Sequence, residues 1–233
     1  QFMANHQMLD PGTRKPWRVV TGGSSRYVDK LLPRLRAEVR AGTPVRSVTR
    51  AADGGVLLRF DGGEQRFDQV VLACHSDQAL ALLSDPSPAE VEVLGAIPYQ
   101  RNDTVLHTDA SLLPQRRAAW AAWNALRLRQ PAGSEPACTV SYSMNLLQRI
   151  DSPQPFVVTL NASSRIDPSR VLARMDYAHP IYTHATVAAQ QRWDEINGVR
   201  NTWYAGAWWG WGFHEDGLRS GVRVATALGA GWD

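Results

Sequence analysis

Apolar residues occur along this chain in short runs, separated by glycine and proline. The first long run has helical spacing and follows Gly22-Gly23, so it predicts a helix that begins at Ser24 or Ser25 and ends before Gly42. Pro33 lies inside this run and should bend or restart the helix. A short strand is predicted just before it, at residues 17–20.

Three strand patterns follow at residues 45–50, 56–60 and 67–74. Asp61-Gly62-Gly63 stands between the second and the third, which predicts that these two strands form a hairpin. The third pattern contains a continuous apolar run, Val70-Val71-Leu72-Ala73, typical of a strand buried on both faces in a parallel sheet. Short helices are expected next, at residues 78–83 and 89–94.

The middle of the chain has a β character of its own. Strands are predicted at residues 102–108, 139–144, 155–161 and 171–177, and a short helix at 187–192. Residues 116–128 fit a helix or a strand with a loop. We therefore expect a second, β-rich domain inserted into the first.

The last forty residues combine a strand, a loop and a helix. Residues 202–205 predict an apolar strand, and residues 206–212 form a loop of glycine and tryptophan. A helix then opens at Glu215-Asp216, where acidic side chains favour the positive end of the helix dipole, and Gly229 ends it. Its apolar positions are Leu218, Val222, Ala225 and Leu228.

The composition excludes several classes of protein. With 233 residues, 44% hydrophobic and 20% charged, the chain is typical of one large or two small globular domains. No apolar run approaches the roughly 20 residues that cross a bilayer. The net charge is only +3 and the arginines are scattered, which argues against nucleic-acid binding. Two cysteines cannot build a disulfide framework, so we expect reduced thiols and a cytoplasmic protein.

Familiar catalytic and metal motifs are missing. The six histidines do not have the spacing of metal ligands, and no metal site is predicted. Cys74 and His75 are neighbours on a predicted strand and point to opposite faces, which argues against a thiolate pair. A triad from His75, Ser76 and Asp77 fails for the same reason. The sequence identifies no catalytic residue.

The final segment, TWYAGAWWGWGFHEDGLRSG, resembles the C-terminal FAD-binding motif of the flavin-containing amine oxidoreductases. Two further stretches resemble the middle segment of that family: VVTGGSSRYVDKLLPRLRAEVRAGTPVRSVTR and FDQVVLACHSDQALALL. The resemblance covers roughly residues 11–95 and 200–233. It is strongest to a bacterial subgroup of NAD/FAD-binding, amine-oxidase-like proteins.

This resemblance implies an α/β (α+β) fold: a partial, Rossmann-like FAD-binding domain with an inserted substrate domain. The FAD-binding domain would comprise residues 1–95 and 196–233, and the β-rich substrate domain residues 96–195. Implied cofactor-binding residues are Val45 beside adenine, Ala73 and Cys74 near the pyrophosphate, and Gly206, Ala207, Asp216, Gly217 and Leu218 around the flavin. The backbone amides of the last three would face the ring. Trp211 and Phe213 would shape the substrate cage.

The chain also departs from the family pattern. The dinucleotide-binding motif Gly-x-Gly-x-x-Gly does not occur, and the chain opens with Gln1, so we expect the C-terminal part of a longer flavoprotein, inactive and flavin-free alone. Ala207 replaces an aspartate that holds a ribityl hydroxyl, and Asp216 replaces a glycine. Lysine occurs only at positions 15 and 30, and neither lies in the middle domain or near the end motif. Many amine oxidases of the family use a lysine near the flavin, so this departure argues against amine oxidation, while a desaturase-type reaction on an apolar substrate stays compatible.

The expected function follows from these points. The full protein would be an FAD-dependent oxidoreductase that transfers a hydride from an amine or an apolar C–C substrate, a small molecule, to flavin. A non-catalytic ligand- or partner-binding protein that kept the fold is the alternative. A homodimer that restores the missing half is a further one. Tyr99, Trp123, Asn124, Tyr142 and Asn145 are candidate pocket residues.

Overall fold

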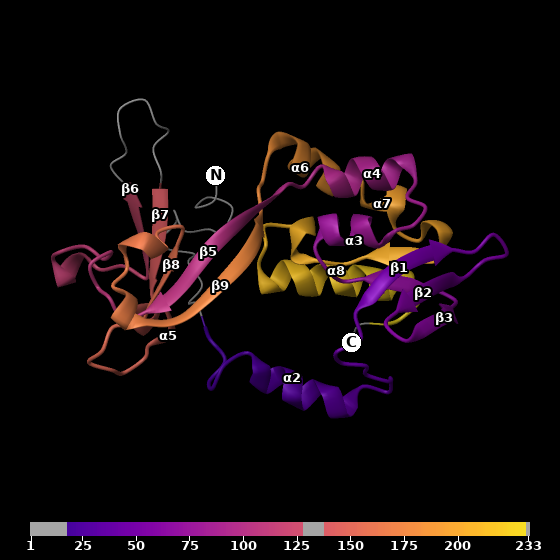
Figure 1. Ribbon diagram of the computed structural model, residues 1–233. Coiled ribbons are helices and arrows are strands. Elements are labelled where there is room, and N and C mark those ends of the chain that lie inside the picture. Colours follow the sequence, from indigo (N-terminus) through magenta and orange to yellow (C-terminus); the bar gives the residue numbers. More distant parts are fainter. Residues whose placement is uncertain (1–17, 128–137, 232–233) are drawn as a thin grey trace. The chain divides into compact units, whose positions relative to one another are not determined.

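The computed structural model describes residues 18–127 and 138–231, which fall into two units, Gln1–Ala41 and Gly42–Asp233 (Figure 1). In the first unit, helix α2 spans Ser25–Leu31 and a 3-10 turn spans Leu32–Arg34. The helix begins where the sequence predicts, but it ends at Leu31 because Pro33 has no backbone N–H to continue it, and the chain is extended from Leu35. The strand predicted at residues 17–20 is wrong for residues 18–20, which form no regular structure.

The second unit opens with a three-stranded antiparallel sheet. Its strands are β1 (Val45–Arg50), β2 (Val56–Phe60) and β3 (Gly63–Phe67). The predicted hairpin is right about its turn and wrong about its third strand. Strand β3 pairs with β2 from Phe60↔Gly63 to Val56↔Phe67, so the pairing ends at Phe67, where the third strand was expected to begin.

The apolar run after that point is a separate strand, β4 (Val70–Leu72). It pairs in parallel with β10 (Thr202–Tyr204), which lies some 130 residues later in the chain. The predicted parallel pairing is therefore confirmed. Burial on both faces is not, because Val71 is 42% exposed while Val70 and Leu72 are buried.

Helices surround these two strands. They are α3 (Ser76–Leu82), α4 (Pro88–Gly95), α6 (His184–Gln190), α7 (Trp193–Ile196) and α8 (His214–Ala227). Helix α4 begins with a capping box, in which Ser87 Oγ accepts from the Glu90 amide and the Glu90 carboxylate accepts from the Ser87 amide. The shared core contains Val48, Val56, Val70, Leu72, Ala79, Leu83, Val93, Leu94, Ile97, Ala189, Ile196, Tyr204 and Trp208.

Helix α8 packs through a different face than its apolar pattern suggests. Ser220 and Val224 are its buried residues, whereas Leu218 is 52% and Leu228 43% exposed. Of the expected apolar stripe, Leu218 and Leu228 therefore lie toward solvent, while Val222 and Ala225 are half-buried.

A five-stranded antiparallel sheet occupies the middle of the chain. Its order is β6 (Trp123–Arg127), β7 (Cys138–Ser143), β8 (Val157–Leu160), β5 (Tyr99–His107), β9 (Val171–Pro180), and helix α5 (Met144–Gln148) follows β7. The ambiguous stretch 116–128 contains a 3-10 turn at Arg117–Ala119 followed by β6. The mixed α/β class is confirmed, while the boundaries of the inserted domain stay a prediction.

The sequence predicts neither a membrane-spanning helix nor a metal site. Within residues 18–127 and 138–231, no helix is long and apolar enough to cross a membrane. The same residues contain no group of three or more histidine, cysteine or acidic side chains that could hold a metal ion.

Candidate functional site

The carboxyl ends of β4 and β10 lie at one edge of their small parallel sheet. Tyr204 is paired with Leu72, and the Ala205 amide donates to the Leu72 carbonyl at 3.1 Å. The segments that leave the two strands therefore start side by side. Ligands of open α/β sheets bind beyond this edge of parallel strands.

Trp208 joins the two segments. Its side chain is only 3% exposed, and its Nε1 donates to the Cys74 carbonyl at 3.0 Å. A Cβ on Gly206 would come within 2.3 Å of the same Nε1, so this close packing requires glycine at position 206. The Gly206 amide in turn donates to Ser220 Oγ at 2.8 Å, which ties the loop to α8.

Asp216 organises the loop in front of α8. Its Oδ2 accepts from the backbone amides of Trp211 and Phe213, both at 3.0 Å. A Cβ on Gly210 would lie 2.4 Å from Oδ1, so the carboxylate occupies the space beside that glycine. The negative charge at position 216 therefore stabilises the loop and the helix start.

The structure changes the prediction of which backbone amides at the start of α8 are free to bind a ligand. Helix α8 begins at His214, and the Gly217 amide donates to the Phe213 carbonyl at 3.1 Å as the first intrahelical bond. Gly217 and the next residue, Leu218, thus cannot present free amides, because helical amides from the fourth onward bond within the helix. The first-turn amides without an intrahelical acceptor are those of His214, Glu215 and Asp216.

The other predicted residues lie around the same core. Ala73 is exposed and Cys74 half-buried, and burial raises the pKa of the Cys74 thiol. Ala207 follows β10, and its carbonyl accepts from the Gly210 and Gly212 amides. Val45, in β1, is half-buried against the core that includes Trp208.

Trp211 and Phe213 are half-buried in the loop that leads into α8. The ring centroids of Trp211 and Tyr182 lie 5.4 Å apart. Tyr182 lies two residues after Pro180, where β9 ends. The structure thus brings Ala73, Cys74, Gly206 and Ala207 together. Trp211 and Phe213 follow along the same loop, and Asp216 lies in the first turn of α8.

Three further polar side chains gather near this edge. His75 stacks on Tyr99 with ring centroids 4.6 Å apart, and the Tyr99 hydroxyl accepts from the Ser76 amide at 3.0 Å. Tyr182 Oη and His75 Nδ1 are buried and have no hydrogen-bond partner among the described residues. Burial, with the Asp216 charge second, raises the pKa of Tyr182, so its hydroxyl stays protonated.

The sequence named Tyr99 but missed His75 and Tyr182 as members of this cluster. Tyr182 could have been found only from its contact with the loop: a Cβ on Gly212 would lie 2.9 Å from its hydroxyl. Of the remaining pocket candidates, Asn124 and Asn145 form hydrogen bonds with backbone groups of their own sheet region, and Asn145 also lines a separate pocket of about 160 Å³.

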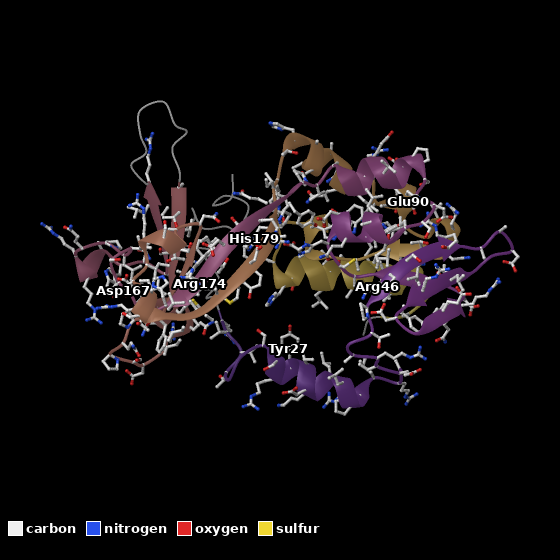
Figure 2. All side chains as sticks on the ribbon, in the orientation of Figure 1. Tyr27, Arg46, Glu90, Asp167, Arg174 and His179 are labelled. Atoms are coloured by element: carbon white, nitrogen blue, oxygen red, sulfur yellow. The ribbon has the colours of Figure 1, made fainter. Side chains whose placement is uncertain are left out.

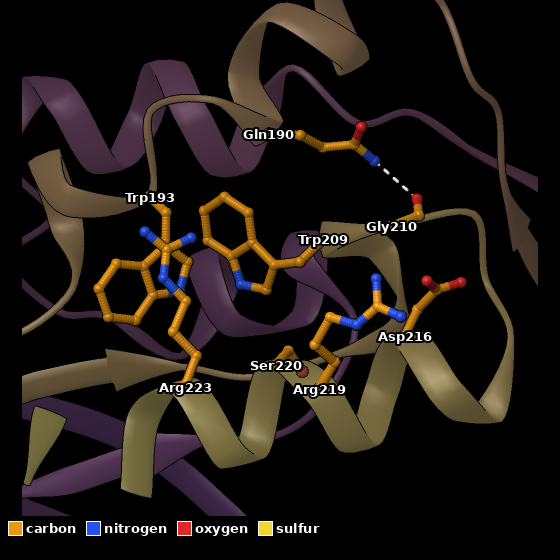
Figure 3. Close-up of a pocket in the computed structure, with 8 residues that line it drawn as sticks. All are labelled: Gln190, Trp193, Trp209, Gly210, Asp216, Arg219, Ser220 and Arg223. Carbon is orange, nitrogen blue, oxygen red and sulfur yellow. Dashed lines mark hydrogen bonds between the residues drawn. The ribbon is translucent and has the colours of Figure 1, made fainter. Parts of the chain in front are cut away.

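A pocket of about 120 Å³ lies beside α8 (Figure 3). It is lined by Gln190, Trp193, Trp209, Gly210, Asp216, Arg219, Ser220 and Arg223. Gln190 Nε2 donates to the carbonyls of Trp208 and Gly210, at 2.8 and 2.7 Å, and so fixes the back of the loop.

The chain is similar to known proteins both in sequence and in structure. Residues 2–108 match the sequence model of the family described as flavin containing amine oxidoreductase. A fatty acid isomerase from P. acnes that produces CLA has a similar structure, with a TM-score of 0.62 and 16% identity over 88% of this chain and 52% of that one. A protein from Exiguobacterium sp. 255-15, provisionally named a protoporphyrinogen oxidase, gives 0.63 and 17% over 98% and 57%.

Wild-type putrescine oxidase bound to putrescine is also similar, with a TM-score of 0.57 and 12% identity over 89% of this chain and 53% of that one. The chain therefore spans about half the length of the solved structures it matches, and at these identities the likeness shows the fold. The resemblance drawn from the sequence is confirmed, since residues 2–108 match the model of the flavin-containing amine oxidoreductases and the chain has the fold of these solved structures.

Proposed function

We propose that this chain supplies one side of the flavin site of an FAD-dependent oxidoreductase, which takes a hydride from an amine or an apolar C–C substrate. One observation carries the proposal: segments about 130 residues apart meet at the carboxyl edge of parallel strands. They are fixed there by the hydrogen bond from Trp208 to the Cys74 carbonyl and are followed directly by the start of α8.

The groups at this edge fit a flavin. A flavin ring presents carbonyl oxygens and ring nitrogens, which require neutral donors and acceptors at short range. The edge offers the first-turn amides of α8 together with the unpartnered Tyr182 Oη and His75 Nδ1. Buried polar atoms without partners are costly, so a ligand that satisfies them would bind with a gain.

When bound, the flavin would supply the hydride-accepting chemistry, and the chain would orient and shield it. The amides of His214, Glu215 and Asp216 would stabilise negative charge on a ligand at the helix start, because they carry the positive end of the helix dipole. Trp211 and Phe213 would exclude water from the reacting face. Roles for Val45, Ala73, Cys74, Gly206 and Ala207 as cofactor contacts remain part of this proposal.

The substrate class within the proposal leans toward an apolar C–C bond. Residues 42–233 contain no lysine, so this region cannot provide the lysine that many amine oxidases use. Ala207 has no side-chain hydrogen bond to offer a ribityl hydroxyl, which would leave backbone groups or water to hold it. The similar structures include a fatty acid isomerase and a putrescine oxidase, so this fold carries substrates of both classes.

The setting of the protein is proposed on simpler grounds. Both cysteines are free thiols, one half-buried and one exposed, which favours the reducing cytoplasm as the location of the protein.

We propose residues 1–95 and 196–233 as the FAD-binding domain and residues 96–195 as the substrate domain. A homodimer is one way to complete the site.

The test is the visible absorption of the natural gene product after purification and after FAD is added. A yellow protein, or one that takes up FAD with a perturbed flavin spectrum, supports the proposal. A folded, colourless protein that takes up no FAD would favour the alternative, a ligand- or partner-binding protein without catalysis.

A matched pair of variants places the flavin at this edge. Trp208→Phe removes the hydrogen bond to the Cys74 carbonyl and should weaken FAD binding about five- to tenfold. Trp120→Phe removes the same kind of bond, from an indole N–H to the Pro114 carbonyl at 2.8 Å, but near the five-stranded sheet, and should leave FAD affinity unchanged. Equal effects of the two variants would contradict the proposed location.

A further inference from the structure

We propose that the pocket between α8 and the α6–α7 segment binds a small oxyanion, a phosphate or carboxylate group, at a site separate from the flavin edge. The inference does not depend on the proposed oxidoreductase function, because it rests on the pocket's own donors. The residues that carry it are Trp193, Arg219 and Arg223.

The pocket presents two guanidinium groups from one helix. Arg219 and Arg223 are four residues apart on α8, so their side chains lie on the same face (Figure 3). Guanidinium groups each carry five N–H donors in a planar fork, which matches the oxygens of phosphate and carboxylate groups.

Trp193 adds an independent sign of a missing ligand. This residue is only 6% exposed, and its Nε1 is buried without a hydrogen-bond partner among the described residues. The Arg223 guanidinium lies 3.8 Å from the centroid of its ring, which holds the indole and the charge together at the pocket wall. A buried indole N–H is a donor only, and none of the described residues accepts its proton.

The arginines have only weak internal partners. Arg219 lies 3.7 Å from Glu215 and Arg223 lies 3.3 Å from Asp194, and all four side chains are at least half exposed. Exposed pairs of this kind contribute little and rearrange readily. An oxyanion held by both forks can therefore compete with these two carboxylates.

The polar side chains on the other walls are already hydrogen-bonded, except for one carboxylate oxygen, Asp216 Oδ1. Gln190 Nε2 donates to two loop carbonyls, and Ser220 Oγ accepts from the Gly206 amide and donates to the Gly217 carbonyl. The Asp216 carboxylate accepts two loop amides through Oδ2. Unsatisfied donors thus outnumber unsatisfied acceptors, which favours an acceptor-rich ligand over a cation.

The size of the pocket limits the ligand. A volume of about 120 Å³ is large enough for a small anion such as one phosphate or a short carboxylate. The pocket also reaches Trp209 and Gly210, on the loop that leads to the flavin edge. A bound oxyanion would therefore touch the back of this loop.

The test follows the tryptophan indole N–H signals of the full chain by ¹⁵N–¹H NMR while inorganic phosphate is added. Trp193→Phe identifies the Trp193 signal among the nine tryptophans. We expect this signal to move on addition of phosphate, and a parallel titration with acetate shows whether carboxylates share the site. Sodium chloride at equal ionic strength should leave the signal in place.

Three arginine variants complete the test. Arg219→Gln and Arg223→Gln should each weaken phosphate binding about tenfold. Arg59→Gln removes an equally exposed arginine outside the pocket and should change nothing. A Trp193 signal that ignores both anions, or a shift that survives the loss of both pocket arginines, would overturn the proposal. Loss of phosphate binding when FAD is present would overturn the claim of a separate site.

Discussion

The two main parts of the second unit bury polar groups in opposite ways. Under the parallel strands, a charged cluster joins Arg50, Glu90 and Tyr204, and Glu90 lies at the start of α4 (Figure 2). In the five-stranded sheet, the buried cluster is neutral and runs from His107 through Thr159 to Ser141. The charged cluster should lose stability when one of its charges is removed, and the neutral cluster should lose stability when one of its groups becomes charged.

The charged cluster connects elements that are far apart in sequence. Arg50 Nη2 donates to Glu90 Oε2 at 2.8 Å, both side chains are 1% exposed, and the Tyr204 hydroxyl donates to Oε1 at 2.6 Å. Burial, followed by hydrogen bonding to Glu90, raises the pKa of Tyr204. The cluster thereby holds β1, α4 and the end of β10 together, at the point from which the loop of the candidate site leaves.

The neutral cluster lies within one sheet. His107 Nε2 lies 2.8 Å from Thr159 Oγ1, which lies 2.8 Å from Ser141 Oγ, and all three residues are fully buried. His107 Nδ1 accepts from the Asp109 amide at 3.2 Å, which requires the neutral imidazole protonated on Nε2. Every link in this chain is a hydrogen bond between uncharged groups.

The largest effect should come from Glu90→Gln. This change removes one of the two carboxylates that pair with the buried Arg50 guanidinium, and Asp85 Oδ1 remains 3.1 Å from Arg50 Nε. Because Asp85 is retained, the loss of unfolding free energy should reach about 3 kcal/mol, the lower end of the cost of an uncompensated buried charge. Urea denaturation of both proteins measures the loss. A value below about 1 kcal/mol would mean that the pair is not buried as described.

The double variant Arg50→Met/Glu90→Met sharpens this result. Removing both charges replaces the ion pair by apolar side chains, so the loss should be clearly smaller than the sum of the two single losses. Additive losses would argue that the two side chains do not interact.

Gly206→Ala should have the next largest effect on stability. Gly206 lies in the loop that leads from Tyr204, a member of the charged cluster, to the candidate site. The φ of Gly206 is 168°, an extended value, so the obstacle is steric: the added Cβ meets Trp208. Overpacking of this kind costs about 1–3 kcal/mol. Thermal or urea unfolding would reveal it, together with weaker FAD binding.

Gly221→Ala is the matched control. Gly221 lies inside α8, and a Cβ there would have nothing within 4 Å. Alanine in a helix is favoured over glycine, so this variant should gain about 0.5–1 kcal/mol. Destabilisation by both variants would mean that the contact with Trp208 is not the cause.

Acid should weaken the neutral cluster. Burial lowers the pKa of His107 below its usual 6.5, so the folded state binds the proton less readily than the unfolded state. The contribution of His107 to stability is complete above about pH 6.5 and falls below it, by up to about 1.4 kcal/mol per pH unit, until the folded form is also protonated. Urea unfolding between about pH 7 and pH 5 measures this slope.

His107→Gln should flatten this part of the pH dependence, because glutamine stays neutral in both states. The variant will be less stable at neutral pH, since its fit between Thr159 and the Asp109 amide is imperfect. An unchanged slope would assign the pH dependence to another group.

The structure also shows which parts of the fold can be predicted from local sequence patterns. The strands at 45–50 and 56–60 and the helix at 89–94 are confirmed near their predicted bounds, because local periodicity and capping decide them. The partner of β4 depended on a strand some 130 residues away, and only its continuous apolar run indicated a parallel sheet. The third strand of the hairpin was misplaced because the strand that follows the Asp61-Gly62 loop, Gly63–Phe67, has only one apolar side chain and so shows no strand pattern.

The candidate site was predictable only in part. The motif placed the loop and the helix start, but the first free amide was misplaced because α8 begins at His214. Buried partners such as Glu90 for Arg50, or the Trp208 bond to the Cys74 carbonyl, join distant segments without a periodic pattern. The unpartnered hydroxyl of Tyr182 is likewise visible only once the loop is folded.

The smallest effect is expected for the exposed ion pair between Arg101 and Asp176, which joins β5 to β9. It has the same chemistry as the buried pair of Arg50 and Glu90, but its side chains are 74% and 54% exposed, so water screens both charges. Asp176→Asn should therefore cost at most about 1 kcal/mol in urea unfolding. A loss as large as that of Glu90→Gln would show that burial is not what separates the two pairs, and the contrast between the two regions would need another cause.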